Sequence, residues 1–126
     1  MFVNNDPRAA AKYFADKVAF TTVPAEVVSA LRDVTLEIVD VRDEDDYATA
    51  HIPGSVFLAE TEWATGGTLD PEKMHVLVSY SATCRRAAKA AVALAKLGFS
   101  VMEMEGGFAS WKEQDFPTEA MVVETG

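Results

Sequence analysis

Cys84 is the only cysteine of the chain, and Arg85 and Arg86 follow it directly. A short apolar run, residues 76–80, precedes it and is typical of a buried strand, whereas apolar residues recur after it at the spacing of a helix. A turn from a strand into a helix leaves backbone N–H groups unpaired beside the positive end of the helix dipole. These groups, together with cationic neighbours, favour a thiolate over a thiol. The pattern therefore indicates a nucleophilic cysteine in an anion-binding turn.

Other interpretations of these residues remain open. A lone cysteine is also often a small buried hydrophobe that does no chemistry. Arginines at the start of a helix can lie over the surface with their charge in solvent, and Arg85 is interpreted in this way. Residue types and spacing alone do not decide between these roles.

The composition limits the class of protein. The chain has 126 residues, 49% of them hydrophobic, and is expected to form one domain with its own core. It contains no apolar run that could span a bilayer and no signal-peptide pattern, so a cytoplasmic location is predicted. One cysteine excludes an internal disulfide and a multi-cysteine zinc site, and no metal or cofactor is implied. The formal net charge of −9 disfavours nucleic acid and anionic membranes as partners, whereas a positive turn suits a small anion.

Strand and helix patterns alternate along the chain. The spacing predicts helices over residues 7–20, 24–31, 43–49 and 108–114, a helix between Cys84 and Gly98, and strands over 20–23, 36–41, 55–58, 76–80 and 100–104. The first helix, with Asp6 as its N-cap and Pro7 at its first position, is expected to cover the sheet. The alternation predicts an α/β fold, a three-layer α/β/α sandwich with a central, mostly parallel five-stranded sheet.

Polar residues stand at the carboxyl end of the predicted strand 36–41. Asp40 and Arg42 occupy this position, where open parallel sheets keep their ligand crevice, and are expected to support the turn that holds Cys84. His51 precedes a Pro-Gly turn. It is interpreted as pinning that turn by hydrogen bonding, although a general base is an alternative.

Two segments resemble the signatures of the rhodanese superfamily. The first reads IVDVRDEDDYATAHIPGSV, and the second reads LAKLGFSVMEMEGGFASWKEQDFP. The order and spacing of Asp-Val-Arg, His-Ile-Pro-Gly, Leu-Gly-Phe and Gly-Gly match the family over about residues 20–118. The resemblance implies one rhodanese-like domain over residues 1–126, with residues 1–19 as an N-terminal helical extension.

The resemblance implies a sulfurtransferase. In this family a loop cysteine takes a sulfane sulfur from thiosulfate or a similar donor, becomes a persulfide, and passes the sulfur to cyanide, a thiol or an acceptor protein. Here the usual cysteine position falls on Ser81 and the usual loop arginine on Arg86, while Cys84 stands later in the loop. The hypothesis is that Cys84 is the nucleophile and that Arg86 orients the anionic donor. The cradle would consist of the backbone amides of Ser81, Ala82, Thr83, Cys84 and Arg85.

The displaced cysteine supports a second hypothesis, a catalytically inactive rhodanese-like module that binds a small anion or a partner protein. A third class with this fold, the cell-cycle phosphatases and arsenate reductases, needs a Cys and an Arg with five residues between them. In this chain Ala90 stands where that arginine would follow Cys84, so the third class is disfavoured.

Overall fold

Five parallel strands form the centre of the fold. A computed structural model describes residues 3–121, and the strands are β1 (Thr21–Thr22), β2 (Leu36–Asp40), β3 (Val56–Phe57), β4 (Met74–Val78) and β5 (Ser100–Met104). Their order across the sheet is β1-β5-β4-β2-β3, and each pairing between neighbours is parallel. The carboxyl ends of β2 and β4 therefore lie side by side, with Asp40 opposite Val78.

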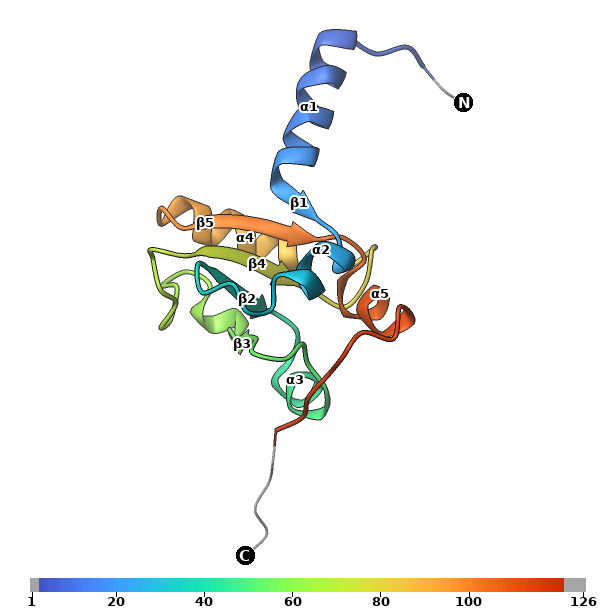
Figure 1. The fold of residues 1–126 in the computed structure, drawn as a ribbon. Coiled ribbons are helices and arrows are strands. Elements are labelled where there is room, and N and C mark those ends of the chain that lie inside the picture. Colours follow the sequence, from blue (N-terminus) through green and yellow to red (C-terminus); the bar gives the residue numbers. More distant parts are fainter. Residues whose placement is uncertain (1–2, 122–126) are drawn as a thin grey trace, which may run out of the picture.

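Helices cover both faces of this sheet (Figure 1). The helices of the chain are α1 (Pro7–Phe20), α2 (Pro24–Ser29), α3 (Glu44–Thr49), α4 (Arg86–Lys96) and α5 (Gly107–Glu113), with a 3₁₀ helix η1 (Glu60–Glu62), and all but α1 lie against the sheet or its ends. Side chains along a strand alternate between the two faces, so Val39 and Leu77 pack with α4 on one face. Val76 and Met104 pack with α2 and α5 on the other. The predicted three-layer α/β/α sandwich is confirmed.

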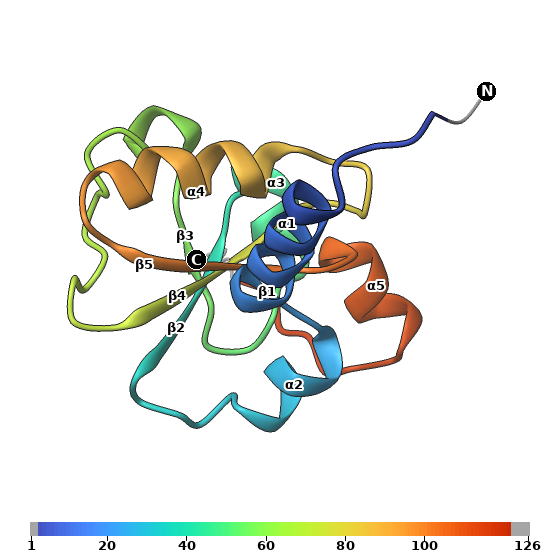
Figure 2. The same cartoon turned by 90° about the horizontal axis from the view of Figure 1, so that it is seen from above.

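The N-terminal helix α1 does not lie on a face of the sheet. Figure 1 shows it projecting from the edge at β1, and Figure 2, seen from above, shows it standing over β1. Its start is as predicted, because the Asp6 side chain accepts a hydrogen bond from the Arg8 amide. The prediction that it covers the sheet is wrong, and none of its residues is buried. The reason is that α2, α4 and α5 already cover the two faces, and α1 runs into β1 without an intervening residue.

Several elements are shorter than the sequence predicted. The helix expected over residues 24–31 ends at Ser29, and β1 and β3 have 2 residues each. The structure also contains one pairing that the sequence did not predict. His51 and Glu119 form an antiparallel bridge, which ties the C-terminal segment to the turn after α3.

Candidate functional site

The loop between β4 and α4 holds Cys84. Its amide N–H donates to the Ser81 carbonyl over 3.1 Å, which closes a tight turn. α4 begins at Arg86, and the Cys84 side chain is partly exposed. The local geometry is thus a strand, a turn and a helix, in the order that the sequence predicted.

The surroundings of the Cys84 thiol favour its ionised form. Burial of the thiol opposes ionisation, but the backbone amides of Arg86 and Tyr80 and the hydroxyl of Ser79 stabilise the thiolate. The positive charge of Arg86 acts in the same direction, and together these groups hold the pKa of Cys84 below its usual value. The thiol therefore lies within reach of amides from both ends of the loop.

The start of α5 packs against the same loop. The amide of Phe108 donates to the Ser79 carbonyl over 2.7 Å, and the amide of Ala109 donates to the Tyr80 carbonyl over 2.9 Å. Gly107 has a φ of +59°, and a Cβ at this position would stand 2.5 Å from the Ser79 carbonyl oxygen. Glycine permits both this conformation and this close approach. The Gly-Gly pair of the sequence thus allows α5 to hold the loop.

Asp40 and Arg42 form a buried ion pair at the end of β2. Arg42 Nε lies 3.1 Å from both carboxylate oxygens of Asp40, and Nη2 donates to Oδ2 over 2.9 Å. The Arg42 amide donates to Oδ1, and Nη2 also donates to the Ala50 carbonyl over 2.7 Å. A buried charge pair with all of these partners fixes the geometry of the strand end.

Tyr80 links this ion pair to the loop. The Arg42 guanidinium lies over the ring of Phe108, 4.1 Å from its centre, and over the ring of Tyr80, 5.8 Å from its centre. The Tyr80 hydroxyl donates to the Asp46 carboxylate and accepts from the Asp43 amide over 3.0 Å. Burial and the Asp46 hydrogen bond raise the pKa of Tyr80 to about 12, so the hydroxyl remains a donor at neutral pH. Asp40 and Arg42 are thus linked through Tyr80 to the loop that holds Cys84.

The Arg86 side chain joins the start of α4 to the end of β2. Its Nε donates to the Val41 carbonyl over 2.8 Å. The guanidinium forms ion pairs with Asp43 at 3.3 Å and with Glu60 at 3.6 Å, and the side chain is 24% exposed. The two carboxylates offset part of its charge, so Arg86 both anchors the helix and contributes positive charge beside the thiol.

His51 is held by contacts within its own turn. Its Nδ1 lies 2.7 Å from the Tyr47 carbonyl oxygen, and its ring stacks on the Tyr47 ring with 3.9 Å between centres. Its Nε2 lies 3.5 Å from the Glu119 carboxylate, which also accepts a hydrogen bond from the Gly54 amide. These contacts pin the His-Ile-Pro-Gly turn, which is the structural role expected from the sequence.

The remaining residues of the predicted cradle lie on the outer side of the loop. Ala82, Thr83 and Arg85 are exposed, and Ser81 is partly exposed. The hydroxyls of Ser81 and Thr83 lie 3.4 Å apart. Ser81 and Cys84 therefore stand at the two ends of one turn.

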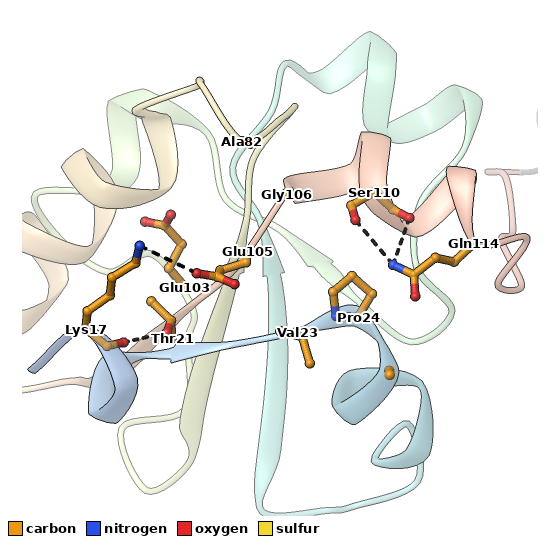
Figure 3. Close-up of a pocket in the computed structure, with 11 residues that line it drawn as sticks. Lys17, Thr21, Val23, Pro24, Ala82, Glu103, Glu105, Gly106, Ser110 and Gln114 are labelled. Carbon is orange, nitrogen blue, oxygen red and sulfur yellow. Dashed lines mark hydrogen bonds and ion pairs between the residues drawn. The ribbon is translucent and has the colours of Figure 1, made fainter. Parts of the chain in front are cut away.

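A pocket of about 700 Å³ lies on the flank of this loop (Figure 3). Ala82 reaches it from the loop, and Ser110 from α5 with Gln114 directly after that helix. Glu103 reaches it from β5, and Glu105 from the residue that follows the strand. Gln114 donates to the carbonyl and hydroxyl oxygens of Ser110 at 3.3 and 3.2 Å. Burial and the charge of Glu105 raise the pKa of Glu103. Because the pocket meets the loop at Ala82, it lies beside the thiol rather than around it.

Within residues 3–121, no group of His, Cys, Asp and Glu side chains is arranged to hold a metal ion. None of the helices that the structure describes is long and apolar enough to cross a membrane.

The fold and the loop together define a class of protein, a parallel α/β sandwich with a cysteine in the turn between a central strand and a helix. The family model of the rhodanese-like domain matches residues 23–114. The chain therefore belongs to the rhodanese-like domain family.

Relatives in sequence and solved structures agree with this assignment. The thiosulfate sulfurtransferase GlpE of Pseudomonas fluorescens strain Pf0-1 is 36% identical over 104 residues, covering 79% of this chain and 91% of the relative. GlpE of Pseudomonas savastanoi pv. phaseolicola is 35% identical and covers 81% of this chain and 95% of the relative. The BH2092 protein from Bacillus halodurans superposes with a TM-score of 0.79 at 28% identity, covering 91% of this chain and 87% of that chain. A full-length protein from Lactobacillus plantarum shares the fold, with a TM-score of 0.82 at 20% identity, covering 92% of this chain and 100% of that chain.

Sequence reasoning did not single out three residues that shape the site. Ser79 supplies a hydroxyl beside the thiol, Tyr80 supplies an amide, and Phe108 binds the Ser79 carbonyl. Ser79 and Tyr80 directly follow β4, so their place at the carboxyl end of a parallel strand was an available signal. The contact of Phe108 joins distant parts of the chain, and no local pattern indicates it.

Proposed function

We propose that the protein is a rhodanese-type sulfurtransferase in which Cys84 carries the transferred sulfur. The observation that carries this proposal is the partly exposed Cys84 thiol in the turn between β4 and α4, where the amides of Arg86 and Tyr80 and the Ser79 hydroxyl lower its pKa. Such groups stabilise negative charge on sulfur. The thiosulfate sulfurtransferases among the relatives support the same reaction class.

The proposed reaction consists of two displacements. In the first, the Cys84 thiolate attacks the outer sulfur of thiosulfate. A new S–S bond forms, the S–S bond of thiosulfate breaks, and sulfite leaves with the electron pair. In the second, cyanide or a thiolate attacks the outer sulfur of the persulfide. This step releases thiocyanate or an organic persulfide and returns the Cys84 thiolate, so no separate oxidant or reductant is needed.

The residues around the thiol have separate roles in this proposal. Amides of the loop stabilise the anionic sulfur of the thiolate and the persulfide. Arg86 attracts and orients the anionic donor, while Asp40 and Arg42 hold the loop through Tyr80. The donor is a small anionic sulfur compound, and the acceptor is cyanide, a thiol or an acceptor protein.

Intact-mass measurement after incubation with thiosulfate tests the proposal. The wild-type protein is expected to gain the mass of one sulfur atom and to lose it when cyanide is added. Cys84→Ala is expected to gain nothing, whereas Ser81→Ala, a matched change in the same turn, is expected to load normally. A wild type that gains no sulfur, or an adduct that persists in Cys84→Ala, rejects the proposal.

A second candidate function rests on Ser81. The resemblance to the family puts a side chain without sulfur at the usual cysteine position, which favours a non-catalytic module that binds a small anion or a partner protein. This alternative predicts a wild type that binds sulfite or thiosulfate in calorimetry without transferring sulfur, and a Ser81→Cys variant that gains turnover. If Ser81→Cys is inactive and the wild type binds no anion, the loop is not an anion cradle in either version.

A further inference from the structure

The apolar face of α1 is left in solvent by the rest of the described chain. Tyr13, Phe14 and Val18 lie on one side of the helix, Phe20 lies at its foot, and all four are between 57% and 77% exposed. Large apolar side chains gathered in this way on one element mark an interaction surface. A helix of 14 residues is also near the length at which an isolated helix is marginal in water. This face therefore needs a partner.

An apolar groove begins at the foot of the same helix. It runs between α4 and the outer edge of β5, has a volume of about 370 Å³, and is here called the β5-edge groove. Its lining includes Phe20, Ala88, Val92, Ala95, Val101 and Met102. Because β1 pairs with β5 only at Glu103 and Met104, the outer edge of β5 before them is open within the described chain. Proteins commonly cover such an edge with a helix or a loop.

The chain's own α1 is not placed to fill this groove. The helix ends at Phe20 and β1 begins at Thr21, so no linker allows α1 to fold back. The junction is fixed further, because the Thr21 hydroxyl donates to the Lys17 carbonyl and the Lys17 ammonium lies 4.0 Å from the Glu105 carboxylate. Figure 1 shows the result, a helix that points away from the body of the domain.

We propose that a second copy of this chain occupies the groove, so that α1 of each protomer lies in the β5-edge groove of the other about a twofold axis. Phe20 ends α1 and also lines the groove, so the helix and the groove meet at this side chain. A twofold arrangement buries both at once, because each chain carries both halves of the contact.

The distribution of charge favours the same partner. Residues 7–20 contain Arg8, Lys12, Lys17 and Asp16, a formal charge of +2 on a chain with a net charge of −9. Glu103 adds a carboxylate to the lining of the groove. A basic helix is therefore attracted at long range to the acidic body of a second copy. Lys89 and Lys96 belong to α4 beside the groove, so apolar contact rather than local ion pairs holds the helix there.

Sedimentation equilibrium of the full chain at micromolar concentration tests this inference, which does not depend on the sulfur chemistry. The wild type is expected to be a dimer. Val18→Glu on the helix face and Val92→Glu in the groove are each expected to raise the dissociation constant of the dimer at least tenfold. Val34→Glu is the matched control, because Val34 is 81% exposed and lies outside both surfaces, and it is expected to change the constant less than twofold. Far-UV circular dichroism verifies that each variant is folded.

A mixing experiment distinguishes this arrangement from pairing between two α1 helices. Val92→Lys alone is expected to weaken the dimer, as Val92→Glu does. When Val92→Lys is mixed with Val18→Glu, one interface of the heterodimer joins Glu to Lys and the other retains both native surfaces. The mixture is therefore expected to recover dimers that neither variant forms alone.

Three results would overturn the inference. The first is a wild type that remains monomeric at these concentrations, whether or not α1 then binds vesicles of anionic lipid. The second is a wild-type dimer that Val92→Glu leaves unchanged. The third is a mixture of Val92→Lys and Val18→Glu that stays monomeric.

Discussion

The Asp40 carboxylate holds the Arg42 guanidinium by hydrogen bonds of 2.9 to 3.1 Å, and the two side chains are 2% and 6% exposed. Removing one partner of a buried pair leaves an uncompensated charge. Asp40→Ala is therefore expected to lower the free energy of unfolding by about 3–5 kcal/mol. Urea denaturation measures this change. Asp16→Ala is the control, because it breaks the exposed Lys12–Asp16 pair and is expected to leave stability almost unchanged. Equal losses in the two variants would contradict the assignment of Asp40 and Arg42 as a brace.

Alanine substitutions at Gly54 and Gly107 should distinguish the cost of a left-handed backbone from the cost of a steric clash, because both have positive φ but only Gly107 lies close to other atoms. Gly54 has a φ of +77° with nothing within 4 Å of an added Cβ, whereas Gly107 has a φ of +59° with the loop backbone at 2.5 Å. Gly54→Ala is expected to cost about 1–2 kcal/mol from its left-handed conformation alone. Gly107→Ala is expected to cost about 1–3 kcal/mol more, because the loop must move. Thermal or urea unfolding gives both values. The steric account fails if the two variants are equally stable.

The environment of Cys84 predicts the pH dependence of its alkylation. Because its pKa is lowered, the thiolate persists to lower pH than in an ordinary cysteine, and reaction with iodoacetamide should begin at correspondingly lower pH. Ser79→Ala removes one group that favours the thiolate and should move the midpoint of the pH–rate profile upward. Thr83→Ala changes an exposed hydroxyl of the same loop and should leave the midpoint in place. A midpoint that Ser79→Ala does not move would remove Ser79 from the site.

Arg86 and Arg85 are neighbours with different surroundings, so their variants should differ in sulfur transfer. Arg86→Ala loses the hydrogen bond to the Val41 carbonyl and the positive charge beside the thiol. A charge-assisted hydrogen bond contributes about 1.5–3 kcal/mol, so kcat/KM for thiosulfate is expected to fall about tenfold or more. Arg85→Ala affects an exposed side chain and should retain activity close to that of the wild type. Steady-state kinetics with cyanide as acceptor provides the comparison, and similar losses in both variants would contradict a specific role for Arg86.

The fold could be predicted because the hydrophobic spacing of each segment indicates the same strand or helix that the sheet and its covering layers contain. The apolar runs at β2, β4 and β5 are too short for helices, and the helical spacing after Cys84 is regular, so the alternation of strands and helices could be inferred correctly. The strand-to-helix turn around Cys84 followed from the same alternation. The helix α1 was also predicted with its correct bounds, because Asp6 and Pro7 mark its start.

The placement of α1 and the contacts of the loop could not be predicted in the same way. Hydrophobic spacing shows that a helix has an apolar face, but it does not show which surface receives that face. Likewise, the amides of Phe108 and Ala109 reach the loop from a segment more than twenty residues later in the chain. The bridge between His51 and Glu119 could not be predicted either, because these residues are far apart in the sequence and no local pattern indicates that they pair.

The dependence of the cysteine loop on α5 has a consequence for biosynthesis. A nascent chain that has emerged only as far as α4 already contains the thiol and the two arginines, but it lacks the N–H groups that bind the carbonyls of Ser79 and Tyr80. The backbone of the loop can therefore be held in place only after residues 107–109 have been synthesised and have folded against it.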